Sequence, residues 1–460
     1  MTTFPLITHD RIDDTLAYCR NEVITVGRFL ADVRQLAALF PPRGHVLNAC
    51  VDRYHFTVGL AAAMVAGKIS LLPPTHTPEM VRQLQAFAPD VFCLTDGHTA
   101  IDLPRVAYPD AVPVGRGESP TDALRALAGV PEIPAAQTVA YVFTSGSTGL
   151  PVPHRKTWGA LVRSVQAAAG QLGLVGGPRH SIIGTVPPQH MYGFESTVLL
   201  ALQSGSALSA EHPFYPADIC SAIAAVARPC LLVTTPVHLR ALLSCGVDIP
   251  PVDLVVSATA PMSPQLAQAS EANFKVPLLE IYGSTETGQI ATRRTATTAQ
   301  WALFPDVRLV LQEDRMWASG GHVEEPVAMS DVLERVDDQH FLLHGRIADL
   351  VNIAGKRNSL AYLNHQLNAI AGVLDGAFFM PDEDDTSKGV TRLLAFAVAP
   401  GLSVATLQAA LRERIDPIFM PRPLVLVERL PRNSTGKLPR EALQALAQAH
   451  KAKGHPQHAV

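Results

Sequence analysis

An apolar strand runs directly into a loop of hydroxyls and glycines at residues 141–149, Tyr-Val-Phe-Thr-Ser-Gly-Ser-Thr-Gly. Residues 139–143 can pair in a buried sheet, whereas Gly146 and Gly149 permit positive φ and let backbone N–H groups converge on an anion. Neutral hydroxyl donors lie in the same loop: Thr144, Ser145, Ser147 and Thr148. The segment therefore predicts a phosphate-binding loop after a strand, with an ordinary Ser/Thr/Gly turn as the alternative. It is not a Walker loop, because no Gly-Lys-Ser/Thr follows.

Short apolar segments alternate with helical segments through most of the chain. The pattern predicts strands at 45–48, 69–72, 231–235, 253–257 and 278–282, and helices at 54–66, 219–226 and 264–274. Strands that alternate with helices in this way form parallel sheets between helical layers. We therefore expect an α/β fold with parallel-rich sheets.

The length of 460 residues exceeds the size at which a single core keeps growing, so more than one domain is expected. We predict a large N-terminal region of several subdomains over residues 1–346 and a small C-terminal α+β domain over 347–460. Within the small domain, helices are expected near 359–370 and 404–415, and strands near 393–398 and 424–427. The tail from Ala447 is expected to fray.

Charge and cysteine usage exclude several classes of protein. The net charge of −4 argues against a general nucleic-acid or anionic-membrane binder. The six cysteines are scattered without a C-x-x-C spacing, which is typical of reduced thiols in a cytoplasmic protein. No run reaches the ~18 apolar residues that a membrane-spanning helix needs, and the N-terminus lacks the pattern of a secretory signal.

Three further motifs follow the 141–149 loop in order: Tyr282-Gly283-Ser284-Thr285-Glu286, Gly345-Arg346-Ile347-Ala348-Asp349, and Pro431-Arg432-Asn433-Ser434-Thr435-Gly436-Lys437. Together with the loop they resemble the adenylate-forming superfamily of acyl-CoA synthetases, peptide-synthetase adenylation domains and luciferases. The resemblance spans nearly the whole chain. It implies a mobile C-terminal domain, the cofactors ATP and Mg²⁺, and activation of a small carboxylic acid as an acyl adenylate that is then transferred to a thiol.

The resemblance also implies roles for individual residues. The loop over 144–149 would hold the β- and γ-phosphates, Thr285 would contact the α-phosphate, and Glu286 would hold Mg²⁺. In the other implied nucleotide contacts, Tyr282 would stack on the purine, the segment around Ala260 would line the adenine, and Gly283 would also bind the nucleotide. Asp331 would accept both ribose hydroxyls, and Arg346 would contact the ribose or phosphate. Each of these residues taken alone could be an ordinary surface residue without a role in binding.

Two residues are implied at the acid. Lys437 would bridge the substrate carboxylate and the α-phosphate when the small domain closes over the site. His190 resembles the gate to the acyl pocket, with a satisfied core histidine as the alternative, and Met191, Tyr192 and Gly193 would line the pocket beside it. Met191 cannot pair with an α-ammonium or a 2-hydroxyl, so it favours an aryl ring or a medium acyl chain.

The sequence departs from the superfamily pattern after the loop. The usual Pro-Lys-Gly is replaced by Pro-Val-Pro-His-Arg-Lys at 151–156, so Arg155 or Lys156 is expected to replace the missing lysine; Ala348 stands at the hinge. A catalytically impaired acyl- or nucleotide-binding regulator therefore remains an alternative, whereas a P-loop phosphotransferase fails on the missing Walker lysine.

The compact size and the 148–158 stretch resemble short bacterial ligases of aryl-pigment pathways. That resemblance implies a 3- or 4-hydroxybenzoate-type acid and an acyl carrier protein as acceptor, with CoA as the other acceptor. A medium-chain fatty acid ligase is the alternative.

Overall fold

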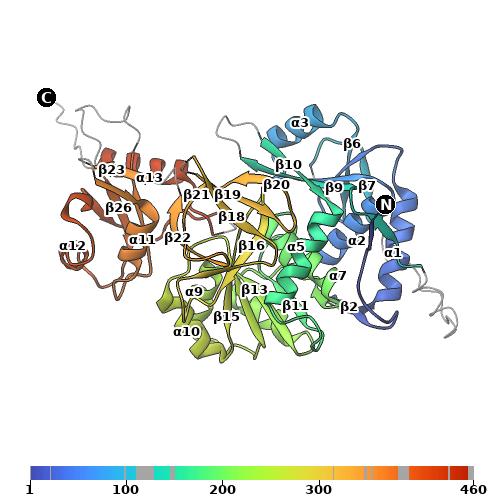
Figure 1. The fold of residues 1–460 in the computed structure, drawn as a ribbon, viewed down its shortest axis with the longest axis horizontal. Helices are drawn as coiled ribbons and strands as arrows, with labels where there is room; N and C mark the ends of the chain where they lie inside the picture. Colours follow the sequence, from blue (N-terminus) through green and yellow to red (C-terminus); the bar gives the residue numbers. More distant parts are fainter. Residues whose placement is uncertain are drawn as a thin grey trace.

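A computed structural model describes residues 2–20, 22–97, 100–109, 129–145, 151–313, 315–346, 350–353, 356–381, 393–433 and 436–453. Two large sheets with their helices form the body of the molecule, and the C-terminal elements, orange to red, lie at the end away from the N-terminus (Figure 1). None of the helices in these ranges is long and apolar enough to cross a membrane.

The first large sheet has six strands in the order β10-β9-β5-β4-β6-β7. Its strands are β4 (His45–Asn48), β5 (Ile69–Leu72), β6 (Val91–Thr95), β7 (Arg105–Ala107), β9 (Thr138–Ser145) and β10 (Pro151–Thr157). All neighbours are parallel except β10, which returns antiparallel to β9. The connecting helices are α1 (Val26–Leu39), α2 (Arg53–Val65) and α3 (Pro78–Phe87), and β1 (Thr3–Pro5) pairs separately with β8 (Glu132–Pro134).

The second large sheet has eleven strands in the order β21-β22-β17-β16-β15-β14-β13-β11-β12-β2-β3. In chain order they are β2 (Thr15–Tyr18), β3 (Val23–Thr25), β11 (Ser181–Gly184), β12 (Ala207–Ser209), β13 (Cys230–Thr234), β14 (Leu254–Ser257), β15 (Leu278–Ser284), β16 (Gly288–Arg293), β17 (Trp301–Leu303), β21 (Asp331–Arg335) and β22 (His340–Arg346). The segment from β2 to β15 is parallel, and the strands beyond it are antiparallel. The predicted α/β class with parallel-rich sheets is confirmed.

Helices cover the second sheet on both faces. One buried apolar cluster joins the two large sheets through α2, α5 (Trp158–Gln171), the π-helix η1 (Phe194–Leu199) and α7 (Leu200–Ser204). On the other face, α8 (Pro216–Ala224), α9 (Pro236–Ser244) and α10 (Pro264–Phe274) bury a second cluster against β11, β13 and β14. A three-stranded sheet of β18 (Arg308–Gln312), β19 (Arg315–Gly320) and β20 (Val323–Ala328) follows.

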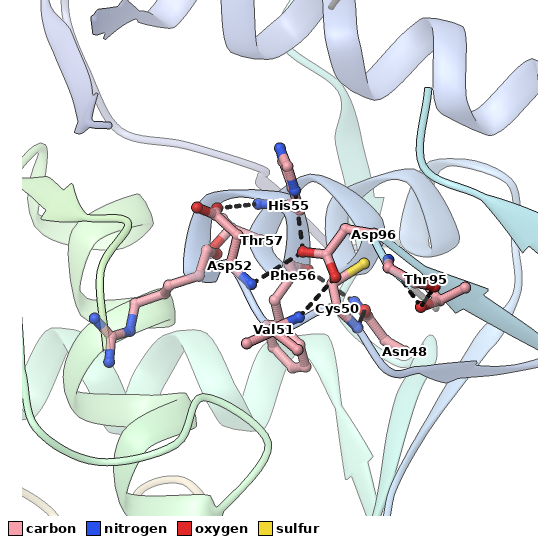
Figure 2. A network of polar contacts seen from close by, with 11 residues as sticks. Asn48, Cys50, Val51, Asp52, His55, Phe56, Thr57, Thr95 and Asp96 are labelled. Atoms are coloured by element: carbon pink, nitrogen blue, oxygen red, sulfur yellow. Dashed lines mark hydrogen bonds and ion pairs between the residues drawn. The ribbon is translucent and has the colours of Figure 1, made fainter. Parts of the chain in front are cut away.

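A polar network fixes the start of α2 (Figure 2). The Asp96 carboxylate accepts hydrogen bonds from the backbone N–H groups of Val51 and Asp52 and lies 3.0 Å from His55 Nδ1. Asp52 in turn caps the helix by accepting a hydrogen bond from the N–H of His55 at 3.0 Å. The network anchors the first turn of α2 to the end of β6.

The next residue, Arg53, ties the two sheets together. Its fully buried guanidinium donates to the carbonyl oxygens of Gly184 (2.8 Å), Val186 (3.0 Å), Ser209 (3.0 Å) and Glu211 (2.5 Å). Two of these carbonyls lie at the end of β11, just before the segment that carries His190. Arg53 therefore links a helix of the first sheet to the backbone that leads into the predicted acyl gate.

After β22 the chain builds smaller units. They are the hairpin of β23 (Leu350–Ile353) and β24 (Lys356–Ser359), the sheet of β25 (Asp375–Phe379), β26 (Leu394–Val398) and β27 (Leu424–Leu426), and the helices α11 (Leu360–Asn368), α12 (Val404–Arg412), η4 (Pro417–Phe419) and α13 (Arg440–Lys453). The domain boundary after residue 346 stays a prediction, and Ala348 lies outside the described residues.

The expectation that the tail frays from Ala447 is wrong as far as Lys453, because α13 continues to that residue. Leu443 and Ala447 stand four residues apart on one face of α13. Both are buried in a cluster with Leu430 and residues of β25 and β26. Packing of this apolar face outweighs the polar composition of the tail.

Candidate active site

A hairpin of β9 and β10 flanks the predicted phosphate loop. Gly146, Ser147, Thr148 and Gly149 lie outside the described residues, as does the side chain of Ser145, so their contacts stay predictions. The pairing of β9 with β10 is nevertheless defined: Thr144 faces Val152, Val142 faces His154, and Ala140 faces Lys156. Because side chains alternate along a strand, Thr144, His154 and Lys156 share one face of the hairpin.

His154 lies between the hairpin and the carboxylate predicted to hold Mg²⁺. Its Nε2 is 2.9 Å from Thr144 Oγ1 and 3.6 Å from Glu286 Oε1. Burial lowers the pKa of His154, although the charge of Glu286 opposes this effect. The imidazole is therefore neutral near pH 7 and contacts the carboxylate as a polar neighbour.

The turn that carries Glu286 is closed by its own hydrogen bonds. Ser284 Oγ accepts from the N–H of Thr287 at 3.2 Å, and Thr287 Oγ1 accepts from the N–H of Ser284 at 3.2 Å. A Cβ added at Gly283 would lie 2.1 Å from the Gly288 carbonyl oxygen, so only glycine fits at this close approach. Partial burial opposes ionisation of Glu286, but hydrogen bonds from its own N–H and from Ser284 hold its pKa below the usual value.

Lys156 lies beneath this turn. Its side chain is buried, and Nζ donates to the backbone carbonyl oxygen of Thr285 and to that of Glu286 at 3.3 Å. Burial lowers the pKa of Lys156, opposed by the carboxylates of Glu195, Glu286 and Glu324. The ammonium that was predicted to replace the missing loop lysine therefore contacts the turn whose Glu286 is predicted to hold Mg²⁺.

Arg155 lies on the other face of β10. It is exposed, and its Nη2 is 3.9 Å from Glu324 Oε2 on β20. Glu324 Oε1 also accepts a hydrogen bond from Thr157 Oγ1 at 2.7 Å. Arg155 and Lys156 consequently cannot act on the same ligand from this strand. Recognising 151–157 as a strand would have indicated this, and would also have singled out His154, which sequence reasoning missed.

A second residue that sequence reasoning missed is Glu195, in the first turn of η1. Burial raises its pKa to about 7, and its Oε1 accepts a hydrogen bond from Ser164 Oγ at 2.8 Å. A Cβ added at Gly288, which has φ +72, would lie 2.9 Å from the same oxygen. Glu195 thus supports the far end of the Glu286 turn from within the core.

The predicted adenosine contacts meet at β15 and β21. Tyr282 Oη donates to Asp331 Oδ2 at 2.6 Å, and the ring centroid lies 5.5 Å from those of Trp301 and Phe341. Asp331 is paired with Arg346 in the register of β21 and β22. The side chain of Arg346 lies outside the described residues. The structure thus brings Tyr282, Asp331 and the backbone of Arg346 together.

The segment predicted to line the adenine follows β14. Ala260 is half-buried there, directly after Thr259, whose φ is +77. A threonine in the left-handed region is strained, and strain of this kind gathers at functional sites. The superfamily's paired glycines are absent at this segment, and Thr259 takes the backbone conformation that glycine would adopt without strain.

The predicted acyl gate begins the helical segment before η1. His190 is the N-cap of α6 (Met191–Gly193), and a Cβ added at Gly193 would lie 2.1 Å from the Pro187 carbonyl oxygen. Met191 is half-buried against the main core. Tyr192 Oη lies 3.1 Å from the carbonyl oxygens of Thr234 and Val256, so its hydroxyl is held at the ends of β13 and β14.

The loop that carries Lys437 packs against α9, next in sequence to β13. Arg432 pairs with Asp375 at 2.7 Å and donates to the Gly436 carbonyl oxygen at 2.9 Å, which shapes the loop before Lys437. A Cβ added at Gly436 would lie 3.0 Å from Val237 Cγ2 on α9. Burial, with the charges of Lys437 and His76, lowers the pKa of His190 to about 4. The charge of Lys437 therefore acts on His190 although 247 positions separate them in the sequence.

Comparisons with known proteins place the chain in a family. The family described as AMP-binding enzyme matches residues 10–316, which is more than half of the chain. The 4-coumarate–CoA ligase of Rhodobacter capsulatus is 32% identical over 282 residues, covering 61% of this chain and 69% of the relative. The 4-chlorobenzoate–CoA ligase of Arthrobacter sp. is 26% identical over 365 residues, covering 70% and 68%. The protein belongs to the AMP-binding enzyme family, as the motifs predicted.

Solved structures show the same fold. ATP-bound MatB from Rhodopseudomonas palustris gives a TM-score of 0.78 at 17% identity, covering 97% of this chain and 98% of that one. O-succinylbenzoate coenzyme A synthetase from Bacillus subtilis, in complex with AMP, gives 0.77 at 17% identity, covering 96% and 98%. With the family established, the protein is an AMP-forming acid–thiol ligase that activates a carboxylic acid with ATP.

Proposed function

We propose that the protein activates an aryl carboxylic acid of the 3- or 4-hydroxybenzoate type and transfers the acyl group to a pantetheine thiol. The observation that supports the proposal is the electrostatic effect of Lys437 on His190, together with the packing of the preceding Gly436 against Val237, because a cation from the C-terminal domain would then act at the predicted acyl pocket. A cation there offsets the repulsion between an incoming carboxylate and a polyphosphate.

The residues present fit Mg²⁺ bound together with the nucleotide. Among the residues that the structure describes, no group of three or more His, Cys, Asp and Glu could hold a metal by itself. Mg²⁺ often binds through one or two carboxylates and takes its other ligands from phosphates and water. The side chain of Glu286 is 43% exposed beside the phosphate hairpin and suits that role. Bound there, Mg²⁺ would neutralise charge on the departing pyrophosphate.

The chemistry then divides into two steps. A carboxylate oxygen of the acid attacks the α-phosphorus and displaces pyrophosphate, with Lys437 and Thr285 at the developing negative charge. The thiol sulfur next attacks the acyl carbon and displaces AMP. Tyr282 and Asp331 would hold the adenosine through both steps, since their mutual hydrogen bond fixes the tyrosine ring beside the aspartate.

The choice of acid rests on Met191 and on the relatives. The thioether of Met191 offers no charge to an α-ammonium and no strong acceptor to a 2-hydroxyl group. Both relatives named above are described as ligases of aryl acids with a substituent at position 4. We therefore expect a ring substituted at position 3 or 4, with an acyl carrier protein as the acceptor and CoA as its competitor.

The test is ATP–pyrophosphate exchange with benzoate, its three monohydroxy isomers, 4-coumarate, octanoate and phenylalanine. A higher kcat/KM for 3- or 4-hydroxybenzoate than for the 2-hydroxy isomer and phenylalanine is expected. A preference for phenylalanine or the 2-hydroxy isomer would overturn the pocket assignment, and a preference for octanoate would remove the aryl assignment. Single-turnover transfer to CoA and to holo acyl carrier protein then identifies the acceptor.

A further inference from the structure

We infer that Lys156 and His154 are positioning residues that together hold the Glu286 turn against the phosphate-binding hairpin, so that the Mg²⁺ ligand is set in place before the nucleotide binds. The inference rests on the proposed function, because that function gives Glu286 its role at the metal. The inference goes beyond the proposed function because it assigns the role of the missing loop lysine to two residues, Lys156 and His154, that act through the turn.

Lys156 fixes one peptide of the turn. Its ammonium donates a hydrogen bond to the carbonyl oxygen of Thr285, and in a planar peptide the N–H points the opposite way. That N–H belongs to Glu286 and donates to the Glu286 carboxylate itself. A cation at one end of this peptide strengthens the hydrogen bond at its other end. Lys156 thus orients the carboxylate without touching it.

His154 lies beside the same carboxylate, on the hairpin. Its Nε2 contacts Thr144 Oγ1 at 2.9 Å and lies 3.6 Å from Glu286 Oε1, so one ring nitrogen faces both the last residues of β9 and the metal ligand. Thr144 is the first residue of the predicted phosphate loop. The ring therefore lies between Thr144 and the carboxylate, and it sets the separation that MgATP would span.

The spacing of the two residues is essential to this arrangement. Positions 154 and 156 share a face of β10, whereas Arg155 between them faces Glu324. A positive charge placed at position 155 would therefore not replace the charge of Lys156. The requirement is for a long cation and an imidazole two residues apart on a strand that returns from the loop.

The experiment measures metal binding directly. Mn²⁺ binding to the protein saturated with α,β-methylene-ATP is followed by electron paramagnetic resonance, alongside the half-saturating Mg²⁺ concentration of ATP–pyrophosphate exchange. Lys156→Met is expected to weaken Mn²⁺ binding about tenfold, the factor expected for one lost hydrogen bond to a charged group. His154→Ala is expected to weaken it about threefold, and His154→Gln, which keeps a polar atom near the Nε2 position, to restore most of the loss.

Matched controls separate positioning from general stability. Lys68 is also a buried lysine, and its ammonium donates to the carbonyl oxygens of Pro41 and Arg43 at 2.9 and 2.7 Å, away from the site. Lys68→Met should lower thermal stability and leave Mn²⁺ binding unchanged. His45, which lies 2.7 Å from Asp90, is the control for His154.

The outcomes are distinct. Unchanged Mn²⁺ affinity in Lys156→Met and His154→Ala, with wild-type exchange intact, would overturn the inference and leave the proposed function standing. Absence of exchange in the wild-type protein with every acid would overturn the proposed function. If Lys156→Met does not fold, the comparison of His154→Ala with His154→Gln decides the question.

Discussion

Two regions face each other at the proposed phosphate site, and they are built in different ways. The turn over 282–288 closes on itself through Ser284 and Thr287 and through the close approach at Gly283. The hairpin over 144–156 directs its polar side chains, His154 and Lys156, toward that turn. The difference teaches that a turn closed by its own hydrogen bonds can be recognised from a short motif of adjacent residues. The role of a supporting hairpin can be recognised only when the segment that it contacts is also known.

The largest expected effect concerns the turn. Glu286→Gln should lower the rate of adenylation about 10²- to 10³-fold, because a single charged group at developing charge contributes on that scale. The rate of pyrophosphate exchange at saturating Mg²⁺ measures this. Glu324→Gln, at an exposed carboxylate on the other face of β10, is the control and should change the rate less than about twofold. Equal losses in both variants would break the comparison between the two faces of the hairpin.

The next effect comes from a group that belongs to neither region. Lys437→Ala should lower adenylation about 10²-fold or more and spare transfer of the acyl group from a preformed acyl adenylate, because the proposed role of Lys437 is at the carboxylate and the α-phosphate. Single-turnover measurements of the two half-reactions test this. A similar loss in both half-reactions would show that the lysine also serves the second step.

A backbone substitution tests how closely the turn packs on the core. Gly288→Ala forces a side chain into positive φ and within 2.9 Å of Glu195 Oε1, and it should lower the unfolding free energy by about 1–3 kcal/mol. Gly173 has a similar φ of +70 with nothing within 4 Å, so Gly173→Ala carries the conformational cost alone. The difference between the two variants, from chemical denaturation, measures the contact with Glu195.

The smallest effect is a pH dependence of folding stability. It comes from Glu195 and not from the hydrogen bonds within the turn. Burial raises the pKa of Glu195 to about 7 from 4.5, so the folded protein keeps a proton that the unfolded chain releases between these values. Stability therefore falls as pH rises through this window, by about 1 kcal/mol from pH 6 to 8. Glu195→Gln should flatten this slope, whereas Ser284→Ala should lower stability equally at both pH values. A steeper slope in Glu195→Gln would contradict the assignment.

Much of the fold followed from local patterns. The strands β4 and β5 and the helix α10 have the predicted bounds, because a continuous apolar run or a Ser-Pro start defines them locally. The helix α13 was not predicted, since its stability comes from packing against β25 and β26. Strand β10 was also missed, because Pro151 and Pro153 argue against a strand. Its pairing with β9 becomes evident only in the folded hairpin.

The site shows the same limit. The motifs named Tyr282, Asp331 and Lys437, yet the bond between the first two joins residues 49 positions apart, and no local pattern predicts it. His154 and Glu195 carry no motif at all. Their significance lies in the distance to a single turn, which only the folded chain defines.

The buried guanidinium of Arg53 has a consequence for dividing the molecule. Arg53 lies on a helix of the first large sheet. Its four acceptor carbonyls lie at or just after β11 and β12 of the second large sheet. Two fragments expressed separately would leave a charged group without partners in one half and four carbonyls exposed in the other. We therefore expect that the two sheets cannot be produced as independent soluble halves, and that co-expressed fragments would recover activity only where Arg53 is retained.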